Sequence, residues 1–392
     1  MINLARLNYL IYRCLYDYIA KLIPEKLMKK ILIIFIPSIE DGGVEKNLFT
    51  TVNYLNKKIK NIKIITCNNN FKNKFKKSIK FIGTKNRFWN NCNKKLKYIV
   101  CLCILFKTLL LKKERILVFA FQANIYSIII SKIFKTKVIT RSNTSPSGWS
   151  KNIFMFYLYK IFLSLANDIM VNSKYFQKEF MKIFKIKTKC IYNPFDKNLI
   201  RNKILIKEKK NFFEKDTLNL ISVGRLTDQK DHLTLLKSLK FINPKLKPRL
   251  MIVGKGNNFH NLKQFIYEQN FQKNVYMTGY LKNPYPAIKN SQIVILTSKY
   301  EGLPNILIEA QFLKKYIIST DCPTGPKEIL LNGLAGDLIK IGDSKKLAHL
   351  INNYKKNRKN ISKKINIGLK NFNRFDHKIN CEKYLNFVLN NF

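Results

Sequence analysis

The chain alternates short runs of apolar residues with longer segments in which apolar residues recur every three or four positions. The short runs are typical of buried strands, and the longer segments are typical of amphipathic helices. In the first half this pattern predicts strands at 30–36, 62–66, 116–120, 137–141, 168–172 and 188–192, and helices at 43–58, 95–111, 123–134, 150–166 and 173–184. Strands that alternate with helices form a parallel sheet covered on both faces.

A second series of the same kind follows. Strands are predicted at 218–223, 249–253, 274–278, 292–297, 316–320 and 338–341, and helices at 229–240, 258–270, 303–313, 343–356, 360–372 and 376–391. A chain of 392 residues exceeds what one hydrophobic core usually organises. We therefore predict two Rossmann-like, doubly wound α/β domains at 28–195 and 217–375, joined by a Lys-rich linker at 196–216.

Residues 1–27 precede the first predicted strand and form a separate amphipathic segment. Asp17 interrupts its apolar face, and no small-residue cleavage site follows, so the segment does not resemble a signal peptide. Three interpretations stay open: a helix on a membrane surface, a helix packed on the protein, and an artefact of a wrongly chosen start codon. Apolar residues recur at helical spacing, with basic residues between them, at Leu4, Leu7, Ile11, Leu15, Tyr18 and Leu22.

No segment reaches the roughly 18–20 uninterrupted apolar residues that span a bilayer. The segment nearest to this length is 99–111, which is short and carries Lys107. A buried helix is the simpler interpretation of it. The alternative is a helix that contacts a membrane, because basic residues flank it at 94–97 and 112–113.

The net charge of +50 is unusual for a globular protein, and most of it comes from Lys. An AT-rich genome favours Lys, Asn and Ile codons and explains part of the excess; attraction to nucleic acid or to an acidic membrane is the functional explanation. The chain has no zinc-finger spacing, KH-type loop or RRM signature, so we expect no nucleic-acid partner. The eight Cys include no CxxC pair and predict buried free thiols in a reducing compartment.

Two carboxylates, Glu301 and Glu309, lie eight positions apart around a predicted strand-to-helix connection. Glu301 falls in a loop, whereas Glu309 lies on the helix that follows, for which Pro304 suits the first turn. An acid at the mouth of a helix and another two turns further on can contact two parts of one ligand. The residues between them that we also assign to the site are Gly302, Leu303, Pro304 and Asn305.

Two further loops at the ends of predicted strands carry groups that suit anions. Gly224 and Arg225 end one strand, and Lys230 follows; two cations at this place can hold a diphosphate through charge-assisted hydrogen bonds. The loop with Thr324, Gly325 and Lys327 enters a helix, where free backbone N–H groups favour an anion. Because open α/β sheets bind ligands beyond the carboxyl ends of their strands, these loops predict one shared site.

Two glycine pairs are weaker signals. Gly254 and Gly256 close a strand, and a plain tight turn explains them as well as a ligand does. Gly42 and Gly43 follow the first strand and open a helix, so their backbone can approach a phosphate or an acceptor. A flexible loop is the alternative for this second pair.

The segment 300–310, together with 223–226 and Gln229-Lys230, resembles the C-terminal half of family 4 glycosyltransferases, which are retaining enzymes of the GT-B architecture. The resemblance is closest to bacterial members that build surface polysaccharides and lipid-linked glycans. It is strong from about 218 to 342 and weak in the first half. It implies two domains that face a cleft, with a C-terminal helix at 376–392 that crosses back onto the first domain.

The resemblance also implies roles for these residues. Arg225 and Lys230 match positions that bind the donor diphosphate, Glu309 would accept hydrogen bonds from the ribose, and Glu301 would meet the donor sugar. Gly254 and Gly256 match a turn near the nucleotide, and Gly42-Gly43 match a GG-x-E motif in the first domain. Many members carry a His near the transferred sugar, where this chain has Arg141 and Asn143; either side chain would have to replace it.

We therefore predict a retaining glycosyltransferase that moves a hexose or N-acetylhexosamine from a nucleotide sugar, UDP-linked, to a lipid-linked or lipopolysaccharide saccharide. No Asp-X-Asp triplet occurs, so we expect no metal and no cofactor. The predicted partners are the donor, the acceptor and an anionic membrane surface, which places the protein in the cytoplasm on the inner face of the cell membrane. A GT-B nucleotide-sugar epimerase and a non-catalytic relative that binds a glycan or a partner are the alternatives.

Overall fold

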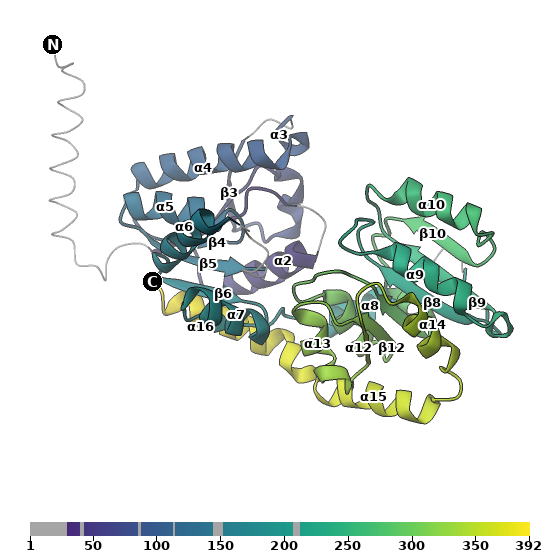
Figure 1. Cartoon of the computed structure of the whole chain (residues 1–392). Helices are drawn as coiled ribbons and strands as arrows, with labels where there is room; N and C mark the ends of the chain where they lie inside the picture. The colour runs from purple at the N-terminus through teal and green to yellow at the C-terminus, as the bar shows by residue number, and fades with distance from the viewer. Residues whose placement is uncertain (1–29, 40–42, 85–87, 113, 144–151, 207–211) are drawn as a thin grey trace, which may run out of the picture.

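The computed structural model describes residues 30–39, 43–84, 88–112, 114–143, 152–206 and 212–392. They form two α/β domains (Figure 1), as the alternation of strands and helices predicts. The predicted N-terminal helix at 1–27 and Gly42 lie outside the described residues.

The first domain contains a parallel sheet of seven strands in the order β3-β2-β1-β4-β5-β6-β7. Apolar side chains point alternately to its two faces, which are covered by different helices. Ile31, Ile33 and Phe35 of β1 share a core with α4, α5, α6 and α7, whereas Leu32 and Ile34 share a core with α2 and α16. The strands are β1 (Lys30–Phe35), β2 (Ile62–Ile65), β3 (Lys80–Ile82), β4 (Arg115–Ala120), β5 (Lys137–Ser142), β6 (Asp168–Val171) and β7 (Lys189–Cys190); the helices are α2 (Gly43–Leu55), α3 (Phe88–Asn91), α4 (Lys94–Leu110), α5 (Asn124–Ile133), α6 (Ile153–Ser164) and α7 (Lys174–Phe184).

The second domain contains a parallel sheet of six strands in the order β10-β9-β8-β11-β12-β13. This is the strand order of a doubly wound dinucleotide-binding fold, and its direction reverses between β8 and β11. The strands are β8 (Leu218–Val223), β9 (Pro248–Val253), β10 (Val275–Gly279), β11 (Ile293–Leu296), β12 (Tyr316–Thr320) and β13 (Asp337–Ile339); the helices are α8 (Lys197–Ile204), α9 (His232–Ser238), α10 (Phe259–Glu268), α11 (Tyr285–Asn290), α12 (Asn305–Phe312), α13 (Gly325–Ile329), α14 (Ser344–Asn352) and α15 (Arg358–Lys370).

The C-terminal helix α16 (His377–Leu389) packs on the first domain, although the strands before it belong to the second (Figure 1). Tyr384, Phe387 and Val388 are buried in the core that contains α2 and β1. The crossing point is held by the backbone, where Phe195 N–H donates to the carbonyl of Phe375 at 2.9 Å. The two domains are therefore joined by two chain segments that lie side by side.

Several elements differ from the predicted ones. The edge strand β3 and the short helices α3, α8 and α11 were not predicted, and α8 occupies the first part of the predicted linker. The helix predicted at 303–313 begins only at Asn305, because Pro304 has an extended backbone and is its N-cap. The helix predicted at 229–240 begins at His232, so Lys230 lies in the preceding loop.

The helix predicted near 99–111 is buried on one side only. Cys101, Leu105 and Leu109 of α4 face the sheet, but Ile99 and Phe106 are exposed. Cys103 on the same helix is also exposed, which corrects the expectation of buried thiols at this position. Among the described residues, no helix has the length and apolarity needed to cross a bilayer.

The packing of α16 gives a stability prediction. Phe387 is 2% exposed and lies against Phe119, with ring centroids 6.2 Å apart. Phe387→Ala should lower the free energy of unfolding of the first domain by about 3–5 kcal/mol, because the cavity adds to the lost burial. Trp89 lies on α3 of this domain, so urea unfolding followed by tryptophan fluorescence reports on it.

The matched control is Leu389→Ala on the same helix, where the side chain is 47% exposed. This change should stay within about 0.5 kcal/mol of the wild type. Equal destabilisation by the two substitutions would contradict the assignment of α16 to the core of the first domain.

Candidate functional site

The predicted site loops meet where the strand order of the second sheet reverses. The loop 224–231 follows β8 and the loop 297–304 follows β11, and these two strands are neighbours. Lys299 N–H donates to the carbonyl of Gln229 at 2.8 Å, and the Gln229 side chain returns a hydrogen bond to the carbonyl of Tyr300 at 2.9 Å. This edge is the usual ligand position in an open α/β sheet.

Lys230 and Glu301 form an ion pair at the centre of this edge. The Lys230 ammonium contacts the Glu301 carboxylate, and their side chains are only 15% and 7% exposed. Ser298 Oγ donates to the same carboxylate oxygen at 2.6 Å. Two groups that were predicted to contact a ligand therefore contact each other.

Arg225 differs from Lys230 in its surroundings. Its side chain is exposed, and it makes no hydrogen bond or ion pair within the described part of the chain. The two predicted cations thus lie on one loop. The Lys230 ammonium is paired with Glu301, whereas the Arg225 guanidinium has no partner among the described residues.

Two glycines are required near the Lys230–Glu301 pair, where the backbone of the turn 254–256 touches the backbone of the loop after β8. A Cβ on Gly254 would lie 1.8 Å from the Gly224 carbonyl oxygen, and a Cβ on Gly256 would lie 2.2 Å from the Leu226 carbonyl oxygen. Leu226 N–H donates to the Lys255 carbonyl at 3.0 Å. The turn at 254–256 therefore packs directly on the loop that carries Arg225, and this contact explains both glycines.

Glu309 is buried on α12 and has partners from two other elements. Tyr285 Oη donates to its carboxylate at 3.1 Å, and Lys46 Nζ lies 3.6 Å from the same oxygen. Burial, and then the charge of Glu309, raise the pKa of the Tyr285 hydroxyl above its usual range, so it stays a donor. Lys46 lies on α2 of the first domain, directly after the predicted loop with Gly43. The ion pair thus joins the two domains.

The loop 321–325 packs against the loop that carries Glu301. Thr324 has φ 95° and ψ −118°, an uncommon backbone for a non-glycine residue, and its hydroxyl donates to the carbonyls of Glu301 and Gly302. A Cβ on Gly325 would lie 1.9 Å from the Gly302 carbonyl oxygen. Lys327 instead pairs with Asp321 at 3.2 Å and is half exposed.

The first domain approaches the same loop from the opposite side. A Cβ on Gly302 would lie 2.8 Å from the Asn143 carbonyl oxygen. Asn193 donates to Asn305 Oδ1 at 2.8 Å and accepts from the Arg141 guanidinium at 2.7 Å. Arg141 is 1% exposed, so it supports the loop through Asn193 and does not line a surface.

Glu328 makes another contact between the domains. Its carboxylate accepts from the backbone N–H groups of Lys174 and Tyr175 at 3.0 and 3.2 Å, at the start of α7 in the first domain. Tyr192 Oη donates to it at 2.5 Å, and burial raises the pKa of that hydroxyl. A carboxylate at the N-terminus of a helix is favourable, since it matches both the free N–H groups and the helix dipole.

The sequence therefore indicated the second-domain loops but missed four partners: Lys46, Asn193, Tyr285 and Glu328. Lys46 follows the predicted Gly42-Gly43 pair within one helical turn, and Glu328 directly follows the predicted Lys327. This nearness was the available signal for both residues. Asn193 follows the short strand β7 and Tyr285 is the first residue of the short helix α11, and nothing in their local sequence distinguishes them.

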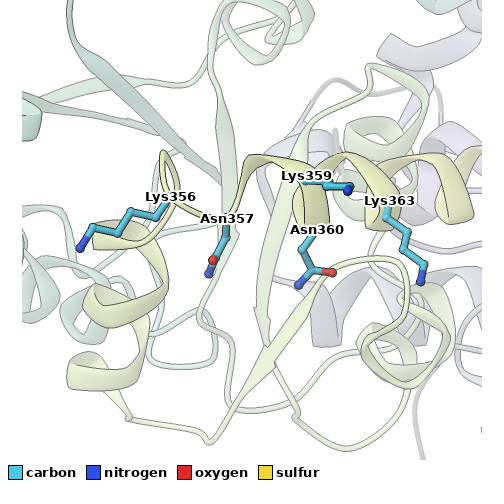
Figure 2. Close-up of a pocket in the computed structure, with 5 residues that line it drawn as sticks. All are labelled: Lys356, Asn357, Lys359, Asn360 and Lys363. Atoms are coloured by element: carbon cyan, nitrogen blue, oxygen red, sulfur yellow. The ribbon is translucent and has the colours of Figure 1, made fainter.

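A surface hollow of about 460 Å³ at the start of α15 lies on different elements from this site. Figure 2 shows its side chains spread over the start of the helix and the segment before it, not pointing toward one another. It consists of exposed lysines and asparagines, namely Lys356, Asn357, Lys359, Asn360 and Lys363, and we assign no ligand to it.

Comparison with known proteins finds a family match over part of this chain. Residues 202–369 match the family described as Glycosyl transferases group 1. An uncharacterized glycosyltransferase of Methanocaldococcus jannaschii is 36% identical over 219 residues, which are 52% of this chain and 53% of that protein. The N-acetylgalactosamine-N,N'-diacetylbacillosaminyl-diphospho-undecaprenol 4-alpha-N-acetylgalactosaminyltransferase of Campylobacter jejuni is 29% identical over 226 residues, which are 55% of this chain and 60% of that enzyme. The matched region thus spans little more than half of these relatives.

Solved structures agree with the whole two-domain arrangement. The Anabaena protein HepE in complex with UDP-glucose superposes with a TM-score of 0.72 over 93% of this chain and 100% of that chain, at 17% identity. Sucrose-phosphate synthase from Thermosynechococcus elongatus gives 0.74 over 92% and 98%, at 14% identity. At these identities the likeness concerns the fold, and it confirms the predicted GT-B architecture.

The buried His232 beside Lys230 gives a pH prediction. Burial, and secondarily the charge of Lys230, lower its pKa from the usual 6.5 to about 4. Since the unfolded chain takes up this proton near pH 6.5 and the folded chain does not, stability is lost as the pH falls through that range. Between about pH 7 and pH 5, the wild type should lose about 2 kcal/mol more unfolding free energy than His232→Phe, measured by urea unfolding with circular dichroism.

The control is His260→Phe at an exposed position of the same domain, which should follow the wild-type pH dependence. An identical loss of stability in wild type and His232→Phe would show that His232 does not stay neutral in the fold.

Proposed function

We propose that this chain, which belongs to the glycosyl transferases group 1 family, is a retaining glycosyltransferase. It would move a hexose or N-acetylhexosamine from a UDP-linked sugar to a lipid-linked or lipopolysaccharide saccharide. The observation that carries the proposal is that Arg225, the Lys230–Glu301 pair and Glu309 follow the neighbouring strands β8 and β11, and that Lys46 of the first domain reaches Glu309. The crystallised complex of HepE with UDP-glucose supports a UDP-linked donor.

In this proposal the second domain binds the donor. Arg225 presents an exposed guanidinium fork for the diphosphate, and Lys230 is held beside it by Glu301. The leaving diphosphate gains negative charge as the glycosidic bond loosens, so cations that bind it more tightly at that point lower the barrier. Lys230 would then turn partly from Glu301 toward the phosphate, which leaves the Glu301 carboxylate to accept hydrogen bonds from the donor sugar.

Glu309 would bind the ribose hydroxyls. Tyr285 fixes one of its oxygens, and Lys46 from the first domain reaches the same oxygen. Occupation of Glu309 by a nucleotide would therefore act on α2, which begins at Gly43. Gly224, Gly254, Gly256, Leu303, Pro304, Thr324 and Gly325 would shape the donor pocket through the backbone contacts that they make.

The acceptor side belongs to the first domain. Asn143 lies against Gly302 at the donor loop, and its Oδ1 has no hydrogen-bond partner among the described residues. We propose that this amide contacts the transferred sugar in place of the His found in many family members. The diphospho-undecaprenol substrate in the name of the Campylobacter relative supports a lipid-linked acceptor. Such an acceptor would place the protein at the cytoplasmic face of an anionic membrane.

The proposal is tested with a panel of nucleotide sugars, each incubated with and without a lipid-linked acceptor, while nucleotide release is followed. A glycosyltransferase releases UDP rapidly only when the acceptor is present. An epimerase converts the donor without any acceptor, and a non-catalytic relative neither converts it nor releases UDP. Either of these last two results would overturn the proposed reaction.

Substitution of either cation should lower turnover by roughly a hundredfold, the size of effect seen when one group that stabilises transition-state charge is removed. The variants are Arg225→Ala and Lys230→Ala, and the measurement is kcat for UDP release with donor and acceptor. Lys230→Ala also leaves the buried Glu301 without its cation, so its unfolding free energy must be measured alongside.

The matched control is Lys299→Ala, an exposed lysine on the neighbouring loop that uses only its backbone there. This variant should retain wild-type turnover. Near-normal turnover in both Arg225→Ala and Lys230→Ala would reject the diphosphate clamp.

A further inference from the structure

The outer surface of α4, α5 and α6 carries a concentration of exposed apolar side chains. α5 packs against both other helices, and their inner residues share one core with the sheet. Figure 1 shows these helices in one layer beside the sheet, and their exposed residues lie on the side of the layer away from that core. We call this surface the apolar face; it includes Ile99 at 57%, Phe106 at 43%, Ile133 at 63%, Ile153 at 69%, Phe154 at 66% and Ile161 at 55% exposure.

Helix α6 contributes most of this surface. Its sequence is apolar around nearly the whole circumference, with Lys160 as its one charged residue, yet Leu163 is its one buried residue. A helix that is apolar all round is ordinarily enclosed by protein or by lipid. Within the described chain, nothing covers the outer side of α6. Contiguous exposed apolar surface of this kind marks a protein or membrane interaction site.

The charge of the three helices favours lipid. They contain no Asp or Glu, and they carry lysines at 94, 95, 97, 107, 132 and 160. On α4, Lys94, Lys95 and Lys107 lie beside the exposed stripe of Leu96, Ile99 and Phe106. Apolar side chains bordered by lysine, without acidic residues, are complementary to the acyl and headgroup regions of an anionic bilayer.

The apolar face is close to the candidate site along the sequence. Asn143 touches the donor loop at Gly302, and Asn152 caps the start of α6, so eight residues of sequence separate them. The most exposed residues of the face, Ile153 and Phe154, are at this end of the helix.

We propose that the apolar face of α4, α5 and α6 docks on an anionic lipid bilayer and orients the cleft toward acceptors embedded in it. This deepens the proposed function, since docking would bring the protein to the membrane that holds a lipid-linked acceptor. The docking itself needs neither donor nor acceptor, so it is testable even if the proposed reaction is wrong.

The test uses the full chain and sedimentation with vesicles of phosphatidylcholine mixed with phosphatidylglycerol. Phe154→Glu/Ile161→Glu places two anions in the exposed face and should lower vesicle binding at least about tenfold. Lys94→Gln/Lys95→Gln, a second and milder variant, should lower binding to these vesicles several-fold. The wild type should bind vesicles of pure phosphatidylcholine more weakly than the anionic mixture.

The matched control is Tyr267→Glu, a 72% exposed aromatic on α10 of the second domain, which should bind vesicles as the wild type does. UDP affinity, measured for every variant, should be unchanged and verifies the fold. The proposal is overturned if the wild type does not sediment with anionic vesicles, or if Phe154→Glu/Ile161→Glu binds them normally. It is also overturned if the wild type is a dimer that this double variant dissociates, because the face would then bind a second copy.

Discussion

The site depends on carboxylates that contact groups from other segments of the chain. Glu301, Glu309 and Glu328 are each held by a group from another segment of the chain: a lysine, a tyrosine with a lysine, and the free N–H groups of a helix. A buried carboxylate without such a partner is strongly unfavourable, so these contacts constrain the loops that provide them. For two of the three carboxylates, Glu309 and Glu328, a partner comes from the first domain. The arrangement of the site and the arrangement of the domains are therefore set by the same interactions.

Close backbone contact adds a second constraint on the same loop. Gly302 lies between the Asn143 carbonyl of the first domain and Gly325 of the second domain. Neither Gly302 nor Gly325 leaves room for a side chain. The strained backbone of Thr324 is held by two hydrogen bonds to this loop. A loop fixed on both sides presents its polar groups with little conformational freedom, which favours a precise fit to a charged ligand.

The sequence allowed the sheets to be predicted because buried parallel strands form continuous apolar runs. It missed β3, whose three residues lie at a sheet edge and are only partly covered, and α8, which buries one residue, Ile200, in a Lys-rich segment. The loops of the second domain could be predicted to lie together because each follows a strand of one sheet. Lys46 and Asn193 could not be assigned contacts in this way, since their partners depend on how two separate domains meet.

The large positive charge has no functional meaning by itself, because a biased genome also enriches lysine. What distinguishes chance from selection is where the lysines are placed relative to other residues. Random enrichment would leave acidic residues in place and would not remove the polar residues that keep a helix soluble. On α4, α5 and α6 acidic residues are absent and many exposed positions are apolar, whereas the second domain keeps Asp and Glu in paired positions such as Lys364–Asp337. The combination of charge with exposed apolar area, and not the charge alone, identifies a surface that interacts.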